Sequence, residues 1–187
     1  DNPIINFRSY GDNAKSVIKF GLPFISGVQS TGLIACAKHY PGHGNTATDS
    51  HTSLPTIRGA KAELMKMELA PFRSAIKAGV EMVMTGHISL PGLDDSGGPA
   101  SHSSLIITQL LRDEMGFKGI IITDGMEMGG LTNSAWTGES AVRAVEAGAD
   151  ILLLPVDVEH TINSLLEAVQ SKRISETRIN KSVEKIW

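Results

Sequence analysis

The chain has 187 residues, a hydrophobic content of 41% and a formal net charge of −3, which predicts one domain with a core of its own. Its basic residues are scattered along the sequence, which excludes the concentrated positive charge of a nucleic-acid-binding surface. No apolar run has the length of a membrane span.

Predicted strands and helices alternate along the chain. Short apolar runs predict buried strands at residues 33–37, 80–85, 118–123 and 150–154. Apolar residues at helical spacing predict helices at residues 13–29, 60–78, 103–115, 139–147, 158–170 and 175–187. Pro23 is expected to kink the first of these helices, and Pro71 is a candidate break in the second.

This alternation is typical of β–α–β units and a parallel sheet, so the predicted fold class is α/β. A complete (β/α)8 barrel has eight units and needs about 250 residues. The four units predicted here fit two architectures. One is an open sheet, and the other is the C-terminal portion of a TIM-like barrel, with about four parallel strands and flanking helices.

The densest group of reactive side chains lies in residues 38–55, KHYPGHGNTATDSHTSLP. Lys38 and His39 follow a predicted strand, and parallel α/β folds place their chemistry at the carboxyl ends of strands. Glycine, proline and small polar residues then predict a mobile loop. In that loop Asp49 is near enough to His51 for the carboxylate to orient the imidazole, although Asp-Ser-His also suits an ordinary turn.

Two other strand ends carry ionisable side chains. His87 follows the strand at 80–85, and Asp124 follows the strand at 118–123. A carboxylate beside an apolar strand is costly to bury unless it is paired or used. Asp124 is therefore either a functional carboxylate or one that is bonded to backbone amides, for example as a helix N-cap.

A zinc site is an alternative interpretation of the histidines. His39, His43, Asp49 and His51 are ligand types that zinc accepts. Tyr-Pro-Gly separates His39 from His43, so their spacing does not place the two imidazoles on one helical face. We therefore expect no metal, and nothing in the sequence indicates another cofactor.

These residues also resemble a known family. Residues 38–44 (KHYPGHG), followed by Asp-Ser-His at 49–51, closely resemble the signature of the β-N-acetylglucosaminidases of glycoside hydrolase family 3, which include bacterial enzymes of peptidoglycan turnover. The resemblance covers essentially the whole chain and includes residues 8–11 (RSYG), 68–72 (ELAPF), 84–87 (MTGH) and 116–124 (GFKGIIITD).

The resemblance implies a role for each matching residue. Asp124 matches the nucleophile, which forms a covalent glycosyl-enzyme intermediate. His51 matches the general acid/base, and Asp49 matches the residue that orients it. Residues that hydrogen-bond the non-reducing N-acetylglucosamine are matched by Arg8, Lys38 and His39. His43 belongs to the motif, and we expect it to order the loop.

The resemblance also bears on fold and substrate. Family members are (β/α)8-like barrels, so residues 1–187 are expected to be a single partial catalytic domain that lacks the first barrel units. The N-terminal part of the barrel is then required for a complete site. Residues 125–128, Gly-Met-Glu-Met, resemble a Met-rich variant found in many family members rather than the tryptophan of its β-glucosidases, which favours an N-acetylhexosamine substrate.

The leading hypothesis is a retaining glycosidase that removes terminal β-N-acetylglucosamine from peptidoglycan fragments or chitin oligosaccharides. A histidine acid/base has a pKa suited to both proton transfers near neutrality. Because it tolerates incoming phosphate better than a carboxylate does, a phosphorylase is an alternative. A non-catalytic sugar-binding barrel fragment is another. The chain starts at Asp1 and shows no signal peptide, so its natural termini are expected to be incomplete and its compartment stays open.

Overall fold

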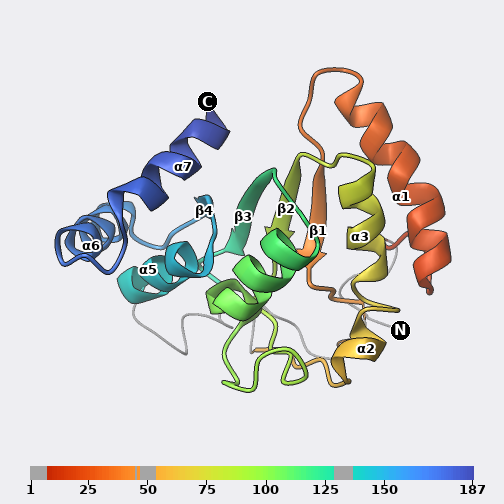
Figure 1. The fold of residues 1–187 in the computed structure, drawn as a ribbon, viewed down its shortest axis with the longest axis horizontal. Helices are drawn as coiled ribbons and strands as arrows, with labels where there is room; N and C mark the ends of the chain where they lie inside the picture. Colours follow the sequence, from red (N-terminus) through yellow and green to blue (C-terminus); the bar gives the residue numbers. More distant parts are fainter. Residues whose placement is uncertain (1–7, 45, 47–53, 129–136) are drawn as a thin grey trace.

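The structure, a computed structural model, describes residues 8–44, 46, 54–128 and 137–187 (Figure 1). A parallel sheet of four strands forms its centre, in the order β1-β2-β3-β4. The strands are β1 (Cys36–Tyr40), β2 (Met82–Thr85), β3 (Ile120–Gly125) and β4 (Ile151–Leu153). Spatial order therefore equals chain order, as in consecutive strand–helix units of a (β/α)8 barrel, and the α/β prediction is confirmed.

Helices connect and flank the strands. They are α1 (Ala14–Gln29), α2 (Lys61–Leu64), α3 (Ala70–Lys77), the short 3-10 helix η2 (Ala100–His102), the π-helix η3 (Leu105–Glu114), α5 (Thr137–Ala147), α6 (Val158–Gln170) and α7 (Glu176–Ile186). Figure 1 shows α1 and α3 beside the β1 edge of the sheet, and α5, α6 and α7 on the β4 side. None of the described helices is long and apolar enough to span a membrane.

The carboxyl ends of the strands meet at one edge of the sheet. Tyr40 pairs with Thr85, Thr85 pairs with Thr123, and Gly125 pairs with Leu153. Two register irregularities lie near this edge, one between β1 and β2 and one between residues 122 and 125 of β3 opposite β4. An irregular ladder turns side chains away from simple alternation, and here it does so beside His39 and Asp124.

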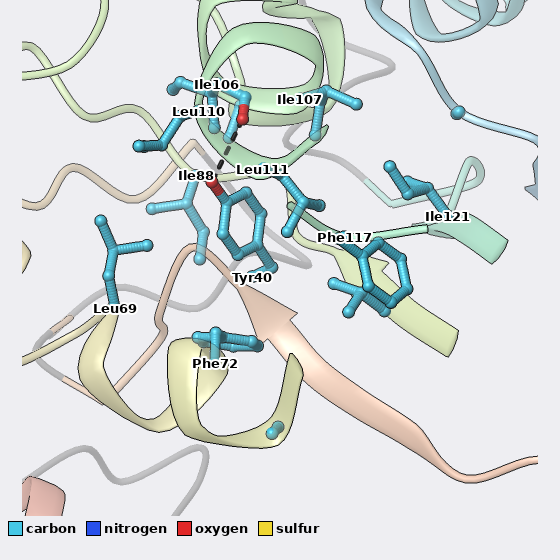
Figure 2. Close-up of a cluster of buried hydrophobic side chains, with 14 of the residues drawn as sticks. Tyr40, Leu69, Phe72, Ile88, Ile106, Ile107, Leu110, Leu111, Phe117 and Ile121 are labelled. Atoms are coloured by element: carbon cyan, nitrogen blue, oxygen red, sulfur yellow. Dashed lines mark hydrogen bonds between the residues drawn. The ribbon is translucent and has the colours of Figure 1, made fainter. Parts of the chain in front are cut away.

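The core packs the sheet against α3 and η3 (Figure 2). Tyr40, the last residue of β1, is fully buried, and its ring meets the ring of Phe72 edge-on with centroids 5.3 Å apart. The Tyr40 hydroxyl donates a hydrogen bond of 3.1 Å to the carbonyl oxygen of Ile106. One side chain therefore joins β1, α3 and η3, and it fixes the backbone that carries His39.

Two expected elements differ from the structure. The apolar run at residues 33–37 is not a buried strand, because Leu33 and Ile34 are 65% and 52% exposed and the ladder begins only at Cys36. Lys38 and His39 therefore lie inside β1 rather than after it. The helix expected at 60–78 is also wrong as one element. It is divided into α2 and α3, with Pro71 in the first turn of α3, where its missing N–H costs nothing.

The remaining elements differ mainly at their ends. Helix α1 runs through Pro23 without interruption. Strand β3 starts later and ends later than expected, at Gly125, so Asp124 is its second-last residue. Asp124 is accordingly not the N-cap of a helix. Helix α6 has the predicted bounds, and the other predicted strands and helices shift by one or two residues.

Candidate active site

The candidate site lies at the carboxyl edge of the sheet. Lys38 and His39 come from β1, His87 follows β2 by two residues, and Asp124 comes from β3. Asp49 and His51 lie outside the described residues. The structure therefore brings together the ends of three neighbouring strands that the sequence marks as reactive.

The Asp124 carboxylate is partly open to solvent. Its side chain is 18% exposed. Oδ1 accepts a hydrogen bond of 2.9 Å from the backbone N–H of Gly125, and Oδ2 lies 3.7 Å from Nε2 of His39. With this one hydrogen bond from the part of the chain that the structure describes, most of the acceptor capacity of the carboxylate is left for a ligand. The bond from the Gly125 amide is the backbone bond that a structural aspartate would make, so it favours neither interpretation alone.

His39 lies beside Asp124 and is nearly buried. Its side chain is 11% exposed, and burial lowers the pKa of the imidazole to about 4, although the negative charge of Asp124 acts in the opposite direction. The positive charges of Lys38 and Arg8 lower this pKa further. At neutral pH His39 is therefore uncharged, and one of its ring nitrogens can accept a hydrogen bond from a hydroxyl while the other donates.

Arg8 and Lys38 supply positive charge at the same edge. Both residues are exposed, and both are near enough to His39 for their charges to act on its pKa. Long cationic side chains around a partly open carboxylate suit a polar, hydroxyl-rich ligand better than an apolar one. The sugar-binding role of Arg8 and Lys38 stays a prediction.

His43 orders the start of the loop after β1. It is buried, and its Nδ1 lies 2.6 Å from Oγ1 of Thr46, whose hydroxyl donates to the carbonyl oxygen of His43 at 3.0 Å. Since the hydroxyl proton is used in that bond, Nδ1 is the donor toward Oγ1. Gly42 approaches Glu68 so closely that an added Cβ would lie 2.8 Å from the Glu68 Cβ. The contact between His43 and Thr46 is local, and the loop-ordering role of His43 stays a prediction.

His87 is enclosed by protein groups. Its side chain is fully buried, Nδ1 lies 2.8 Å from Oγ of Ser101, and Nε2 lies 3.1 Å from the carbonyl oxygen of Gly125. Burial lowers the pKa of this imidazole as well. Both ring nitrogens are engaged, so His87 has no nitrogen available to protonate a leaving group. The sequence marked His87 by its place after a strand, but could not reveal these partners.

No group of three His, Cys, Asp or Glu side chains in the described part of the chain is arranged to hold a metal ion. Two of the four candidate ligands, Asp49 and His51, lie outside that part. Cys36 is exposed as a whole residue, but its thiol is largely surrounded by protein. This burial raises the pKa of the thiol to about 11, which disfavours the thiolate that a metal would need.

Comparison with known proteins defines the class to which this fold and this site belong. Residues 1–187 match the family model described as the N-terminal domain of glycosyl hydrolase family 3. The chain belongs to this family.

Named relatives agree with the assignment. The chain is 32% identical to beta-hexosaminidase A of Pseudoalteromonas piscicida over 206 residues, which cover 100% of this chain and 34% of that protein. It is 37% identical to a beta-hexosaminidase of Neisseria meningitidis serogroup C (strain 053442), over 81% of this chain and 42% of that protein. The chain thus spans about a third to two fifths of the length of these relatives.

A solved structure of the same family superposes closely. It is a glycoside hydrolase family 3 beta-N-acetylglucosaminidase from Paenibacillus sp. str. FPU-7, with a TM-score of 0.96 and 45% sequence identity. The superposition covers 98% of this chain and 36% of that one. The four strand–helix units described here are therefore a portion of a longer glycosidase chain in that protein.

Proposed function

We propose that this chain supplies the nucleophile and part of the sugar-binding site of a retaining β-N-acetylglucosaminidase. The observation that carries the proposal is the Asp124 carboxylate, which is 18% exposed at the carboxyl edge of the sheet and lies 3.7 Å from an imidazole of lowered pKa. The substrate class is a glycan with a terminal β-linked N-acetylglucosamine, such as a peptidoglycan fragment or a chitin oligosaccharide. The named relatives support a hexosaminidase and do not favour a phosphorylase.

In the first step, one Asp124 oxygen attacks the anomeric carbon of the terminal sugar. The bond from that carbon to the aglycone oxygen breaks, and this oxygen takes a proton from His51 in its imidazolium form. In the second step, neutral His51 removes a proton from water. The water oxygen bonds to the anomeric carbon, the ester to Asp124 breaks, and the sugar leaves with its configuration retained.

The other site residues bind and orient the sugar in this scheme. His39 is neutral and close to the nucleophile, so it can exchange hydrogen bonds with sugar hydroxyls without forming a full ion pair with Asp124. Arg8 and Lys38 donate to further hydroxyls. Asp49 keeps the His51 ring oriented and more basic. Fixing the sugar in this way lowers the entropy cost of reaching the attack geometry.

A complete site needs further barrel units in this proposal. Strands β1 and β4 are the two edges of the described sheet. Large apolar side chains next to these strands in the sequence are exposed: Leu33 and Ile34 before β1, and Leu154 and Val156 after β4. An unpaired parallel edge with apolar neighbours is normally covered by the next unit of the fold. Residues 1–187 produced alone should therefore self-associate, and a stable, active monomer of this chain would contradict the requirement.

Covalent labelling of the full-length protein tests the nucleophile. A fluorinated, slowly hydrolysed N-acetylglucosaminide should trap the glycosyl-enzyme, and mass spectrometry should find the label on Asp124. Asp124→Asn should lower turnover of an aryl β-N-acetylglucosaminide by roughly 10⁴- to 10⁶-fold, the range for deleted residues of a catalytic triad, with unchanged thermal unfolding. Asp95→Asn, at an exposed acid, is the control. A label on another carboxylate would refute the assignment. Release of N-acetylglucosamine-1-phosphate in phosphate buffer would indicate a phosphorylase instead.

Leaving-group dependence tests His51. Because nitrophenolate departs with little protonation, His51→Ala should slow the first step far less for a nitrophenyl substrate than for a natural glycan. Without the base, hydrolysis of the glycosyl-enzyme is slow and this intermediate accumulates, so a burst of nitrophenolate should precede slow turnover. Azide, which needs no base, should restore turnover and give the β-glycosyl azide, and Asp49→Ala should show a milder form of the same behaviour. Equal losses on both substrates, with no burst and no rescue, would remove His51 from this role.

A further inference from the structure

Groups from three neighbouring strand ends meet at the Gly125–Met126 peptide, one residue beyond the proposed nucleophile. The carbonyl oxygen of Gly125 accepts a hydrogen bond from His87, which follows β2, and the N–H of Met126 donates to the carbonyl oxygen of Leu153 in β4 at 2.8 Å. These two groups belong to the same Gly125–Met126 peptide. Its plane is therefore held from both neighbouring strands.

The hydrogen bonds fix the tautomer of His87. A carbonyl oxygen can only accept, so Nε2, at 3.1 Å from the Gly125 oxygen, must carry the proton. Burial lowers the pKa of the ring, which keeps it neutral and leaves Nδ1 as an acceptor. The hydroxyl of Ser101, which is fully buried, then donates to Nδ1 at 2.8 Å. The result is a directed chain from Ser101 through His87 to Gly125.

A further hydrogen bond connects this series to the Asp124 carboxylate. Gly125 donates its own N–H, which belongs to the preceding Asp124–Gly125 peptide, to Oδ1 of Asp124 at 2.9 Å, so the Gly125 backbone links the held peptide to that carboxylate oxygen. Glycine has the most freely rotating backbone of all residues, so external support matters more here than at a residue with a side chain. The β3–β4 register also shifts between residues 122 and 125, so an unbroken ladder does not hold Asp124 on that side.

Given the proposed role of Asp124 as nucleophile, we propose that His87 is a positioning residue for it, acting through the Gly125 carbonyl and held in its Nε2–H form by Ser101. His87 does not touch the sugar. It keeps the carboxylate oxygen on the line of attack at the anomeric carbon, where an error of about 1 Å can cost about 10²-fold in rate.

A matched pair of substitutions separates the two ends of the imidazole. Gln at position 87 places an amide N–H near the former Nε2, whereas Asn places its polar atoms near the former Nδ1 and cannot reach the Gly125 oxygen. In the full-length protein, His87→Asn should lower kcat/KM for a nitrophenyl β-N-acetylglucosaminide by about 10²-fold, and His87→Gln should restore most of it. Product inhibition by N-acetylglucosamine should change less than threefold in both variants, an estimate that follows because the sugar contacts are intact.

The rate of inactivation by the fluorinated substrate reports only the attack by Asp124. This rate should therefore fall from the wild type to His87→Gln and further to His87→Asn, as kcat/KM does. Ser101→Ala, which removes the donor to Nδ1, should cause a smaller loss in the same rate and serves if a His87 variant does not fold. A merely structural His87 would lower the unfolding temperature while leaving kcat/KM per folded molecule unchanged. That result, or equal losses in the Asn and Gln variants, would overturn the proposal.

An independent measurement distinguishes failure of this inference from failure of the proposed function. Nitrogen NMR of the ¹⁵N-histidine-labelled wild-type protein reads the tautomer of His87 without any substrate. The expected state is neutral with the proton on Nε2, and loss of that signal in His87→Gln assigns it. A proton on Nδ1 would overturn the positioning role whether or not the protein cleaves the glycan. Absence of turnover in the wild type, together with the Nε2–H form, would instead contradict the function of Asp124.

Discussion

Two aspartates lie at opposite ends of β3 and have opposite surroundings. Asp124, near the carboxyl end, is 18% exposed and takes one hydrogen bond from its neighbouring amide. Asp150, which contacts the amino end, has a side-chain exposure of 0%. Its carboxylate accepts hydrogen bonds from the guanidinium of Arg112, the N–H of Ile121 and the hydroxyl of Ser182.

Cations complete the surroundings of Asp150. Lys185 lies 3.2 Å and Arg178 lies 3.7 Å from Oδ1. Burial alone would raise the pKa of Asp150, but the hydrogen bonds from Ser182 and Ile121 and the charges of Arg112 and Lys185 outweigh it, so the pKa is lowered. The carboxylate joins η3, β3, β4 and α7 at one point. The protein thus satisfies both carboxylate oxygens of Asp150 with hydrogen bonds, whereas Asp124 keeps acceptor capacity for a ligand.

The comparison shows how a parallel sheet separates stability from chemistry. Residues at the amino ends of the strands hold the units together, and residues at the carboxyl ends carry the site. Reactivity therefore depends less on the presence of a carboxylate than on how completely the protein satisfies it. Substitutions at the two ends should separate stability from activity, and we order them by expected effect.

The largest effect on stability is expected at Asp150. Asp150→Asn in the full-length protein removes the charge that Arg112, Arg178 and Lys185 share, and breaking a buried ion pair from one side costs about 3–5 kcal/mol. Urea unfolding should show this loss, while kcat per folded molecule stays within about twofold, since the site lies at the other end of β3. Asp124→Asn is the mirror control, with activity lost and stability kept. A loss of activity in Asp150→Asn without a loss of stability would contradict the separation.

Protonation of the buried histidines and of Asp150 should lower the unfolding free energy in different pH ranges. Burial lowers the pKa values of His39 and His102 to about 4 from 6.5. The unfolded chain therefore binds protons between pH 6.5 and 4 that the folded chain does not bind, so stability falls as the pH falls through this range. Each histidine contributes at most about 3 kcal/mol to that fall. The lowered pKa of Asp150 adds a further loss, but only below its ordinary value of 3.8.

Substitution of His102, which lies outside the proposed catalytic residues, tests whether buried histidines cause the acid sensitivity. His102→Gln should flatten the curve of unfolding free energy against pH between 6.5 and 4, with the exposed His160→Gln as control. Part of the steepness should remain, because the pKa of His87 is also lowered by burial. If the curve keeps its full slope in His102→Gln, proton uptake by this histidine does not contribute to acid sensitivity.

The sequence predicted the carboxyl edge better than the amino edge, for a physical reason. Ile120, Ile121 and Ile122 form a short β-branched run that favours a buried strand, and Asp124 follows it after one residue, Thr123. Lys38 and His39 lie among other reactive residues in a short motif. These signals are local, so composition and spacing are sufficient to detect them.

The residues that sequence reasoning missed depend on distant partners. Asp150 was assigned only to the start of a strand, because its contacts with Arg112 and Ser182 join positions 38 and 32 residues away. The partner of His87 at Gly125 is likewise 38 residues away. The prediction of a buried strand at 33–37 was wrong because it too depends on distant parts of the fold. Apolar residues predict burial, but whether a neighbouring unit covers Leu33 and Ile34 is a property of the fold and not of the run.

The smallest effect is expected at an exposed ion cluster, which isolates the contribution of burial. Arg173 donates to Glu139 and Glu146 of α5 at 2.9 Å each, so it has two charged partners, against three cations around Asp150. Its side chain is 43% exposed, and those of both glutamates are 33% exposed. Water and salt therefore screen these pairs, and the side chains lose entropy when they are held in place.

Arg173→Ala should consequently lower the unfolding free energy by no more than about 1 kcal/mol at low salt, and by less in about 1 M salt. Arg173→Lys keeps the charge but loses the two-sided geometry of the guanidinium, so it should fall between the wild type and Arg173→Ala. Urea unfolding at both salt concentrations, beside Asp150→Asn, measures the difference. Equal losses in Arg173→Ala and Asp150→Asn would mean that burial does not set the contribution of these two charge clusters to stability.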